Sequence, residues 1–290
     1  MECAPALVFK GGTSLSKGWN LIERFSEDID LALDRAYLGE QFAGELSRQE
    51  IKKLRKASRQ FMDTTFRDEL KAKFDAVGLV NVDIQCRESK DSDQDPSIID
   101  IYYPALAETE PYLQPRLQVE VSSRSLREPF TQRTFATFVA GHFAGRPFAD
   151  APITIPVVNP ERTFLEKIFL LHEEFQKPAE KIRVDRLSRH LYDIEKLMQT
   201  PFAKIALQDA DLYNTVIAHR RTFASIADVD YDRHQPATIQ FLPPADLMQA
   251  WESDYKQMQE NMIYGETLPF AMLLEKLTEL QIHINTLSWN

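Results

Sequence analysis

The N-terminal segment begins with an apolar run that a pair of glycines ends. Residues 7–9 (LVF) are followed, after one lysine, by Gly11 and Gly12. An apolar run closed by glycines is typical of a strand that leads into a tight turn. Thr13 or Ser14 carries the hydroxyl that caps a helix, so a short helix is expected to follow the turn.

A second strand is predicted by the strict alternation of residues 28–33 (DIDLAL). Its apolar positions are 29, 31 and 33, and its acidic positions are Asp28 and Asp30. Alternate side chains of a strand point to opposite faces of the sheet. Both carboxylates are therefore expected on one face, about 7 Å apart along the chain.

Residues 40–76 are predicted to form a long, basic helical stretch, since they contain no proline and no glycine after Gly44. Between residues 48 and 73 there are nine Lys or Arg and four Asp or Glu, a local charge of +5 in a chain of net charge −10. Two interpretations remain open: a surface that holds an RNA backbone, or a solvated helix whose side chains form ion pairs with one another.

Further strands are predicted at residues 79–85, 98–103 and 116–122, and a short one at residues 153–158. The polar segment between the first two favours an antiparallel hairpin. From residue 159 the pattern becomes helical, with Pro160 in the first turn of a helix. The helices are expected at residues 160–175, 186–198, 210–223, 246–263 and 269–286.

These patterns together predict an α+β fold in two parts. An N-terminal α/β domain with a mixed sheet covers residues 1–155. A helical domain covers residues 156–290, with the boundary near residue 155.

Composition and charge exclude several classes of protein. A net charge of −10 disfavours non-specific binding of nucleic acid or anionic membrane over the whole surface. No apolar run approaches the roughly 18 residues of a membrane span, and the first residues lack the regions of a signal peptide. Two cysteines, without ligand spacing around them, indicate neither a disulfide framework nor a zinc site. A cytoplasmic location is expected.

The acidic strand and the glycine turn suggest chemistry at phosphorus. Two carboxylates on one face of a strand can hold Mg²⁺ or Mn²⁺, and such ions neutralise a triphosphate. Glu120 is our candidate for a third carboxylate from a neighbouring strand, with Asp100 and Asp83 as weaker candidates. Each feature also has a structural interpretation: the glycines as an ordinary turn, and the acidic residues as a solvated strand face.

Several blocks of the sequence resemble one family. GGTSL (residues 11–15) followed by RFSEDIDL (residues 24–31) resembles the AbiEii-type nucleotidyltransferase toxins, a branch of the DNA polymerase β-like nucleotidyltransferase superfamily. PERTFLEK (160–167), RHLYDI (189–194) and MIYG (262–265) resemble later motifs of that family, so the resemblance runs from about residue 8 to 286. Members of the family usually have a helix before the first strand, and only seven residues precede Val8 here, so a shortened or truncated N-terminus is expected.

The resemblance implies a role for individual residues. Asp28 and Asp30 would bind the metal and would be catalytic together with Lys167 and Asp193. Lys167 would reach the triphosphate, and Asp193 would orient Lys167 or a substrate group. Ser26 would lie at the edge of the nucleotide site, where phosphorylation would repel a nucleotide. The nucleotide phosphates would be held by the glycine turn, through Gly11, Gly12, Thr13 and Ser14.

The resemblance also implies a function. A magnesium-dependent enzyme would transfer NMP from an NTP to an RNA acceptor, with tRNA the expected one, and would release pyrophosphate. It would act as the toxin of a toxin–antitoxin or phage-defence system, arrest growth, and have a cognate antitoxin as partner. The alternatives are a nucleotidyltransferase that modifies a protein or small molecule, and a non-catalytic nucleotide-binding module. The helical domain would complete the active-site cleft.

Overall fold

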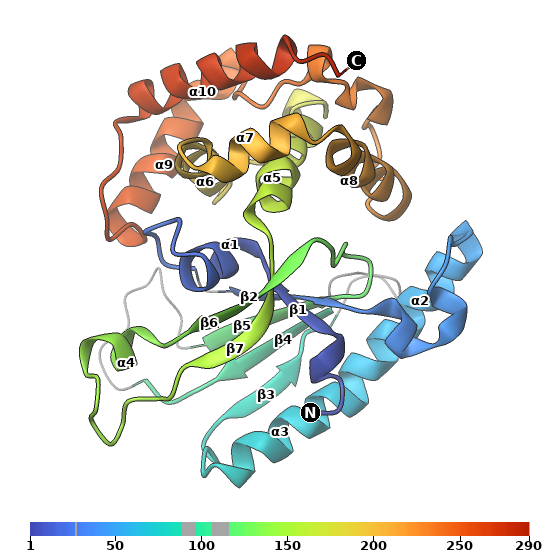
Figure 1. Ribbon diagram of the computed structural model, residues 1–290, viewed down its shortest axis with the longest axis vertical. Helices are drawn as coiled ribbons and strands as arrows, with labels where there is room; N and C mark the ends of the chain where they lie inside the picture. The colour runs from blue at the N-terminus through green and yellow to red at the C-terminus, as the bar shows by residue number, and fades with distance from the viewer. Residues whose placement is uncertain (27, 89–96, 106–115, 290) are drawn as a thin grey trace. The chain divides into compact units, whose positions relative to one another are not determined.

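A computed structural model describes residues 1–26, 28–88, 97–105 and 116–289 (Figure 1). The chain divides into two compact units. Unit 1 consists of Met1–Gly18 and Ser26–Val158, and unit 2 consists of Trp19–Phe25 and Asn159–Asn290. The chain therefore enters unit 2 for seven residues before it returns to unit 1, an excursion that the sequence analysis does not anticipate.

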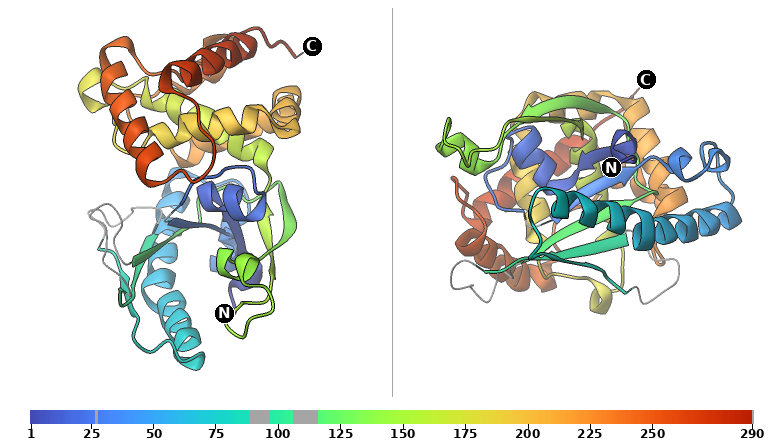
Figure 2. Two further views of the ribbon diagram at one scale, coloured as in Figure 1. Left: turned by 90° about the vertical axis from the view of Figure 1, so that its left-hand side faces the viewer. Right: turned by 90° about the horizontal axis from the view of Figure 1, so that it is seen from below.

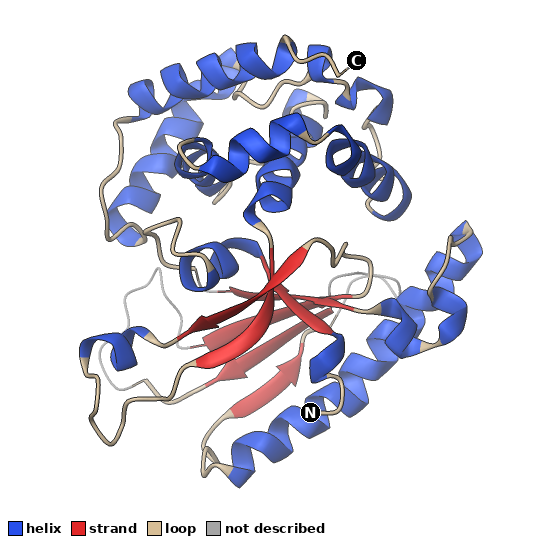
Figure 3. Cartoon of the chain, viewed as in Figure 1, coloured by secondary structure: helices blue, strands red, loops and turns tan. Residues whose placement is uncertain are grey.

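The described part of unit 1 is built on a seven-stranded mixed sheet of order β3-β4-β5-β2-β1-β7-β6, drawn in red in Figure 3. The pairs β2–β5 and β1–β7 are parallel, and the other neighbours are antiparallel. The strands are β1 (Leu7–Lys10), β2 (Asp28–Leu33), β3 (Asp83–Cys86), β4 (Ser97–Tyr102), β5 (Arg116–Ser122), β6 (Phe130–Phe135) and β7 (Ile153–Val158).

One face of this sheet is covered by a long helical segment, as both views of unit 1 show (Figures 1 and 2). The segment runs through α2 (Arg48–Phe61), a π-helical turn η5 (Met62–Phe66) and α3 (Arg67–Ala76). Met62 and Phe66 pack into one core with apolar residues of β2, β4 and β5. The alternate residues of the same strands, among them the acidic positions of β2, therefore face the other side of the sheet.

The long helical segment begins at Arg48, not at residue 40 as predicted. Ser47 and Glu50 form a capping box: the Ser47 hydroxyl accepts from the Glu50 amide, and the Glu50 carboxylate accepts from the Ser47 amide. Such a cap satisfies two amides that the first helical turn leaves free. The cap sets the start of the helix, and residues 35–42 form two short 3₁₀ turns instead.

The described part of unit 2 is helical. Its central helix α5 is almost wholly buried, and aromatic contacts join it to its neighbours: Phe169 packs edge-on against Tyr213 at 4.9 Å between ring centroids. Trp251 and Tyr255 are buried on a further helix. The helices are α5 (Pro160–Glu174), α6 (Ser188–Met198), α7 (Pro201–Gln208), α8 (Ala210–Phe223), α9 (Met248–Asn261) and α10 (Phe270–Asn285).

The predicted α+β class and most elements are confirmed. Three elements were missed: β6, α7 and the short helix α4 (Phe138–His142). β3 is shorter than predicted, because Leu79 and Val80 lie exposed in the turn before it. The polar hairpin segment predicted between β3 and β4 falls largely on residues 89–96, outside the described residues. None of the helices described combines the length and apolar character that crossing a bilayer requires.

Candidate active site

The glycine turn lies directly against the acidic strand. β1 ends at Lys10, and Gly11 begins α1 (Gly11–Thr13), which continues into the π-helical turn η2 (Ser14–Gly18). Gly11 has φ of +76°, and a Cβ at this position would overlap the carboxylate of Asp30. Glycine is therefore required twice here, for the left-handed backbone and for the close approach of the carboxylate.

The hydroxyls beside the glycines bind backbone groups. The predicted cap by Thr13 or Ser14 is wrong, because the helix begins at Gly11 with no side-chain cap. Thr13 Oγ1 instead donates to the carbonyl of Asp28 at 2.5 Å, and the buried Ser14 hydroxyl donates to the carbonyl of Gly11 at 2.8 Å. The Thr13 bond holds the turn against the first residue of the acidic strand, and the Ser14 bond closes the turn on itself. Phosphate binding by this turn, including the buried Gly12, remains a prediction.

The acidic strand has a carboxylate neighbour. In the parallel pairing of β2 and β5, Asp30 stands opposite Glu120 and Asp28 stands opposite Gln118. Gln118 Nε2 donates to Glu120 Oε1 at 2.7 Å. Burial raises the pKa of Glu120, and the charges of Asp30 and Asp28 raise it further. The part of this shift that comes from Asp30 and Asp28 reflects three carboxylates on one face of the sheet.

These side chains suit a divalent cation in their chemistry. The Asp30 side chain forms no hydrogen bond or ion pair with any residue that the structure describes. Carboxylate oxygens are the ligands that Mg²⁺ prefers, and this ion is commonly held by one or two carboxylates together with substrate phosphates. Within the described residues, no three His, Cys, Asp or Glu side chains come close enough to hold a metal by themselves. Asp28 and Asp30 fit such an ion, and Glu120 as its third ligand remains a prediction.

The two weaker candidates differ from Glu120 in their surroundings. Asp100 is 3% exposed and accepts hydrogen bonds from Arg87 at 2.6 and 2.9 Å and from Arg116 at 3.0 Å. Its charge is thus already neutralised. Asp83 is exposed on β3, the edge strand of the sheet. Neither residue pairs with β2, whereas Glu120 does.

Ser26 opens the return of the chain to unit 1. It is partly buried and stands two residues before Asp28, separated from it by residue 27, which lies outside the described residues. Its predicted place at the edge of a nucleotide site remains a prediction.

Lys167 and Asp193 meet inside unit 2. Lys167 on α5 lies 2.7 Å from Asp193 Oδ2 on α6, and their side chains are 8% and 0% exposed. The Lys167 ammonium also lies 3.4 Å from His190 Nδ1. Burial and the Lys167 charge hold the pKa of His190 well below its ordinary value, so this nitrogen accepts. An ammonium has three N–H donors, and these contacts use two of them.

Arg24 completes this cluster, and the sequence analysis missed it. Its Nε donates to Asp193 Oδ1 at 2.7 Å and its Nη2 donates to Oδ2 at 2.8 Å, with Arg24 2% exposed. Burial alone would raise the pKa of Asp193, but Arg24 and Lys167 hold it well below its ordinary value. Burial lowers the pKa of Lys167, and Asp193 opposes that shift. We call Arg24, Asp193 and Lys167 the cationic cluster, because it holds two cations and one carboxylate.

A basic surface lies on the first turns of α2. Arg48, Lys52, Lys53 and Lys56 are exposed there, and we call them the basic face. Lys52 and Lys56 form no ion pair within the described part of the chain. Further along, Arg59 pairs with Asp63 at 3.2 Å and Lys71 with Asp75 at 3.6 Å, each at i,i+4 spacing. Ion pairs along the helix are thus observed in the later part of the segment, and RNA binding by the basic face remains a prediction.

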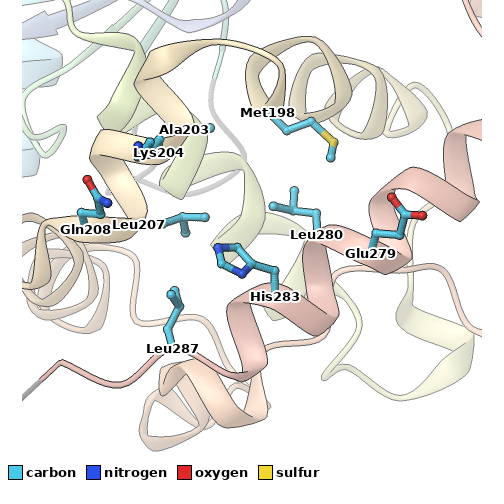
Figure 4. A pocket seen from close by; sticks show the side chains of 9 residues that line it. All are labelled: Met198, Ala203, Lys204, Leu207, Gln208, Glu279, Leu280, His283 and Leu287. Atoms are coloured by element: carbon cyan, nitrogen blue, oxygen red, sulfur yellow. The ribbon is translucent and has the colours of Figure 1, made fainter.

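A pocket of about 530 Å³ in unit 2 contains none of the predicted site residues. It is formed by the end of α6, by α7 and by α10, and apolar side chains make up much of its wall (Figure 4). Its lining residues are Met198, Ala203, Lys204, Leu207, Gln208, Glu279, Leu280, His283 and Leu287.

A glycine turn packed on a strand with paired carboxylates, in a mixed sheet, is the arrangement expected of a nucleotidyltransferase. The family model described as "Nucleotidyl transferase AbiEii toxin, Type IV TA system" matches residues 2–276. The chain therefore belongs to the AbiEii nucleotidyltransferase toxin family of type IV toxin–antitoxin systems. Both the family and the enzyme class predicted from the sequence are confirmed.

Comparison with solved structures finds MenT4, a nucleotidyltransferase toxin from Mycobacterium tuberculosis H37Rv. The two chains are 19% identical with a TM-score of 0.42, over 96% of this chain and 78% of MenT4. No curated protein matches the sequence.

Proposed function

We propose that this enzyme transfers NMP from an NTP to an RNA acceptor, with tRNA as the first candidate, and uses Mg²⁺. The observation that carries the proposal is the Asp30 carboxylate, which lies against Gly11, pairs across the sheet with Glu120 and has no protein partner among the described residues. In this proposal the protein works in the cytoplasm as a growth-arresting toxin of a toxin–antitoxin or phage-defence system, restrained by an antitoxin.

The proposed reaction is an in-line displacement at the α-phosphorus. An acceptor hydroxyl oxygen forms the new P–O bond, the bond to the β-phosphate oxygen breaks, and pyrophosphate leaves while the hydroxyl proton passes to solvent. A divalent cation, when bound, would neutralise the phosphates and favour ionisation of the hydroxyl. Asp28 and Asp30 would hold that cation, and the backbone of the glycine turn would bind phosphate oxygens.

Lys167 retains the role that the family resemblance gives it. Its third N–H is uncommitted among the described contacts, which supports a contact with a phosphate oxygen. Asp193 and His190 orient the ammonium for that contact. An RNA acceptor is supported by the basic face, because exposed lysines without carboxylate partners attract phosphates.

The test is a transfer assay with each α-³²P-labelled NTP, Mg²⁺ and total tRNA. Wild-type protein should label tRNA, and Asp30→Asn should not. Asp83→Asn, an exposed carboxyl on the same sheet, is the matched control and should retain activity. Label on protein or on a small molecule would replace the RNA acceptor with that class. Full transfer by Asp30→Asn would overturn the assignment of the acidic strand.

A further inference from the structure

The segment Trp19–Phe25 is fastened into unit 2 at several points, although it connects two elements of unit 1. Arg24 forms an antiparallel bridge with Ile263. The Phe25 amide donates to the Met262 carbonyl at 2.7 Å, and the Tyr264 amide donates to the Glu23 carbonyl at 3.0 Å. The segment is therefore bound as a short extra strand beside residues 262–264.

The same contacts explain the MIYG block of the sequence. Residues 262–264 supply the backbone groups that bind the segment, and a Cβ on Gly265 would overlap the Glu23 side chain. The Glu23 amide also donates to the hydroxyl of the buried Tyr192 at 3.2 Å. Tyr192 and residues 262–265, which are far apart in the sequence, thus bind the same short segment of chain.

This docking places the Arg24 side chain on Asp193. Its guanidinium bonds both carboxylate oxygens, and its Nη1 donates to the carbonyl of Phe25 at 3.1 Å. A carboxylate held by a planar two-pronged donor cannot rotate without breaking both bonds. Asp193 Oδ2 is therefore fixed where Lys167 meets it at 2.7 Å.

Lys167 already gives Asp193 a buried counter-charge at 2.7 Å. What Arg24 adds is geometric: its two bonds hold in place the carboxylate that orients the ammonium.

We propose that Arg24 is a positioning residue for the transfer reaction, acting on Lys167 through Asp193. The proposal rests on the function proposed above, in which the Lys167 ammonium contacts the nucleotide phosphates. Arg24 itself touches no substrate in this scheme. Its removal leaves the Asp193–Lys167 pair intact but free to reorient, and misplacement of a positioning group by about 1 Å costs on the order of 10²-fold in rate.

The test compares kcat and KM for Arg24→Met, Arg24→Lys, Asp193→Asn and the double variant Arg24→Met/Asp193→Asn. Arg24→Met should lower kcat by about 10²-fold. Arg24→Lys, which keeps the charge but lacks the two-pronged geometry, should recover part of that loss. In the double variant kcat should be no lower than in Asp193→Asn alone, because Arg24 then has nothing to position.

Arg220→Met is the matched control. Arg220 on α8 forms a similar ion pair with the buried Glu173 in the same unit, distant in sequence from the cluster. This variant should lose stability while its folded fraction keeps the wild-type kcat. If Arg24→Met does not fold, Arg24→Lys still tests the proposal. Its kcat should be below that of wild type, and combining it with Asp193→Asn should lower kcat no further than Asp193→Asn alone does.

Two outcomes would overturn the inference: a wild-type kcat in folded Arg24 variants, or losses that multiply in the double variant, as independent structural roles would give. Neither affects the proposed function, which stands or falls with the inactivity of Asp30→Asn. A wild-type protein that transfers nothing to any acceptor would remove the proposed function itself.

Discussion

The acidic face of unit 1 and the cationic cluster of unit 2 gather side chains of opposite charge. On the sheet, Asp28, Asp30 and Glu120 share one face, and the pKa of Glu120 is raised first by burial and then by the charges of Asp30 and Asp28. In the helical unit, Arg24 and Lys167 share one carboxylate. Like charges held close together away from water are costly, so neither grouping is common in a protein interior.

The difference between the two regions indicates which ligand chemistry each suits. The carboxylates of the acidic face suit a cation, and the third N–H of Lys167 suits an anion, as the proposed function assigns them. Each region lies within its own unit, so each can be changed by substitution without altering the other.

The largest effect should come from removing the only carboxylate of the cationic cluster. Asp193→Asn removes the carboxylate that the buried Arg24 and Lys167 both contact, so it should lower the free energy of unfolding by about 3–5 kcal/mol. Arg24→Met should cost less, since the Lys167–Asp193 pair survives. Chemical denaturation at neutral pH measures both.

The pH dependence of this loss follows from the lowered pKa of Asp193. A carboxyl whose folded pKa is depressed stabilises the fold above its unfolded pKa of about 3.9, and that contribution is lost as the pH falls towards the folded value. The gap between wild type and Asp193→Asn should therefore narrow below about pH 4. Asp228→Asn, which breaks the exposed pair with Lys181, is the control and should cost less than about 1 kcal/mol.

The next effect concerns the acidic face. Gly11→Ala places a methyl group on the Asp30 carboxylate and should lower transfer by about 10²-fold, because that carboxylate must move. Gly78→Ala is the matched control: Gly78 has φ of +80° but open space around it. Both variants carry the backbone strain of about 1–2 kcal/mol, and only Gly11→Ala should lose activity in its folded fraction. Equal activities would show that Asp30 tolerates displacement.

The sequence predicted the acidic face better than it predicted the cationic cluster. Asp28 and Asp30 are two residues apart on one strand, and period-two alternation alone puts them on one face. Gly11 is recognisable because so few residues can occupy a tight turn. Local rules of this kind are readable from a single sequence.

Arg24 follows no local rule. It lies 169 residues from Asp193 in the sequence, and the segment that carries it has no periodic pattern. Its partner can be known only once α6 and residues 262–264 are folded around it. Strand β6 was missed for a related reason: it is an edge strand with mostly exposed side chains, so no buried face marks it in the sequence.

A smaller effect is expected from the basic face. Lys52→Glu with Lys56→Glu should weaken RNA binding by about 10-fold and reduce the slope of log Kd against log salt by about one per cation removed. Lys71→Glu with Lys73→Glu, which changes the net charge equally on α3, is the control and should have a weaker effect, because Lys71 already pairs with Asp75. Filter binding of labelled tRNA at several salt concentrations measures both. An equal loss of RNA affinity in the two double variants would show that the RNA does not bind at the basic face.

The smallest effect tests the third carboxylate. The folded pKa of Glu120 is raised, so its charged form destabilises the fold above that pKa, and the free energy of unfolding should increase as the pH falls through it. Glu120→Gln removes the repulsion and should stabilise the metal-free protein at neutral pH by roughly 0.2–1 kcal/mol. Mg²⁺ should then raise the Tm of Glu120→Gln less than that of wild type.

Asp83→Asn is the control for Glu120→Gln, since the Asp83 carboxyl is exposed on the edge strand. It should change neither the stability of the metal-free protein nor the effect of Mg²⁺ on Tm. Thermal melts with and without Mg²⁺ separate two arrangements of the acidic face. A reduced metal effect assigns Glu120 to the cation together with Asp28 and Asp30. If Glu120→Gln stabilises the protein but leaves the Mg²⁺ effect on Tm unchanged, Glu120 repels Asp30 without binding its ion. In that case Asp28 and Asp30 are the carboxylates of the acidic face that bind the metal.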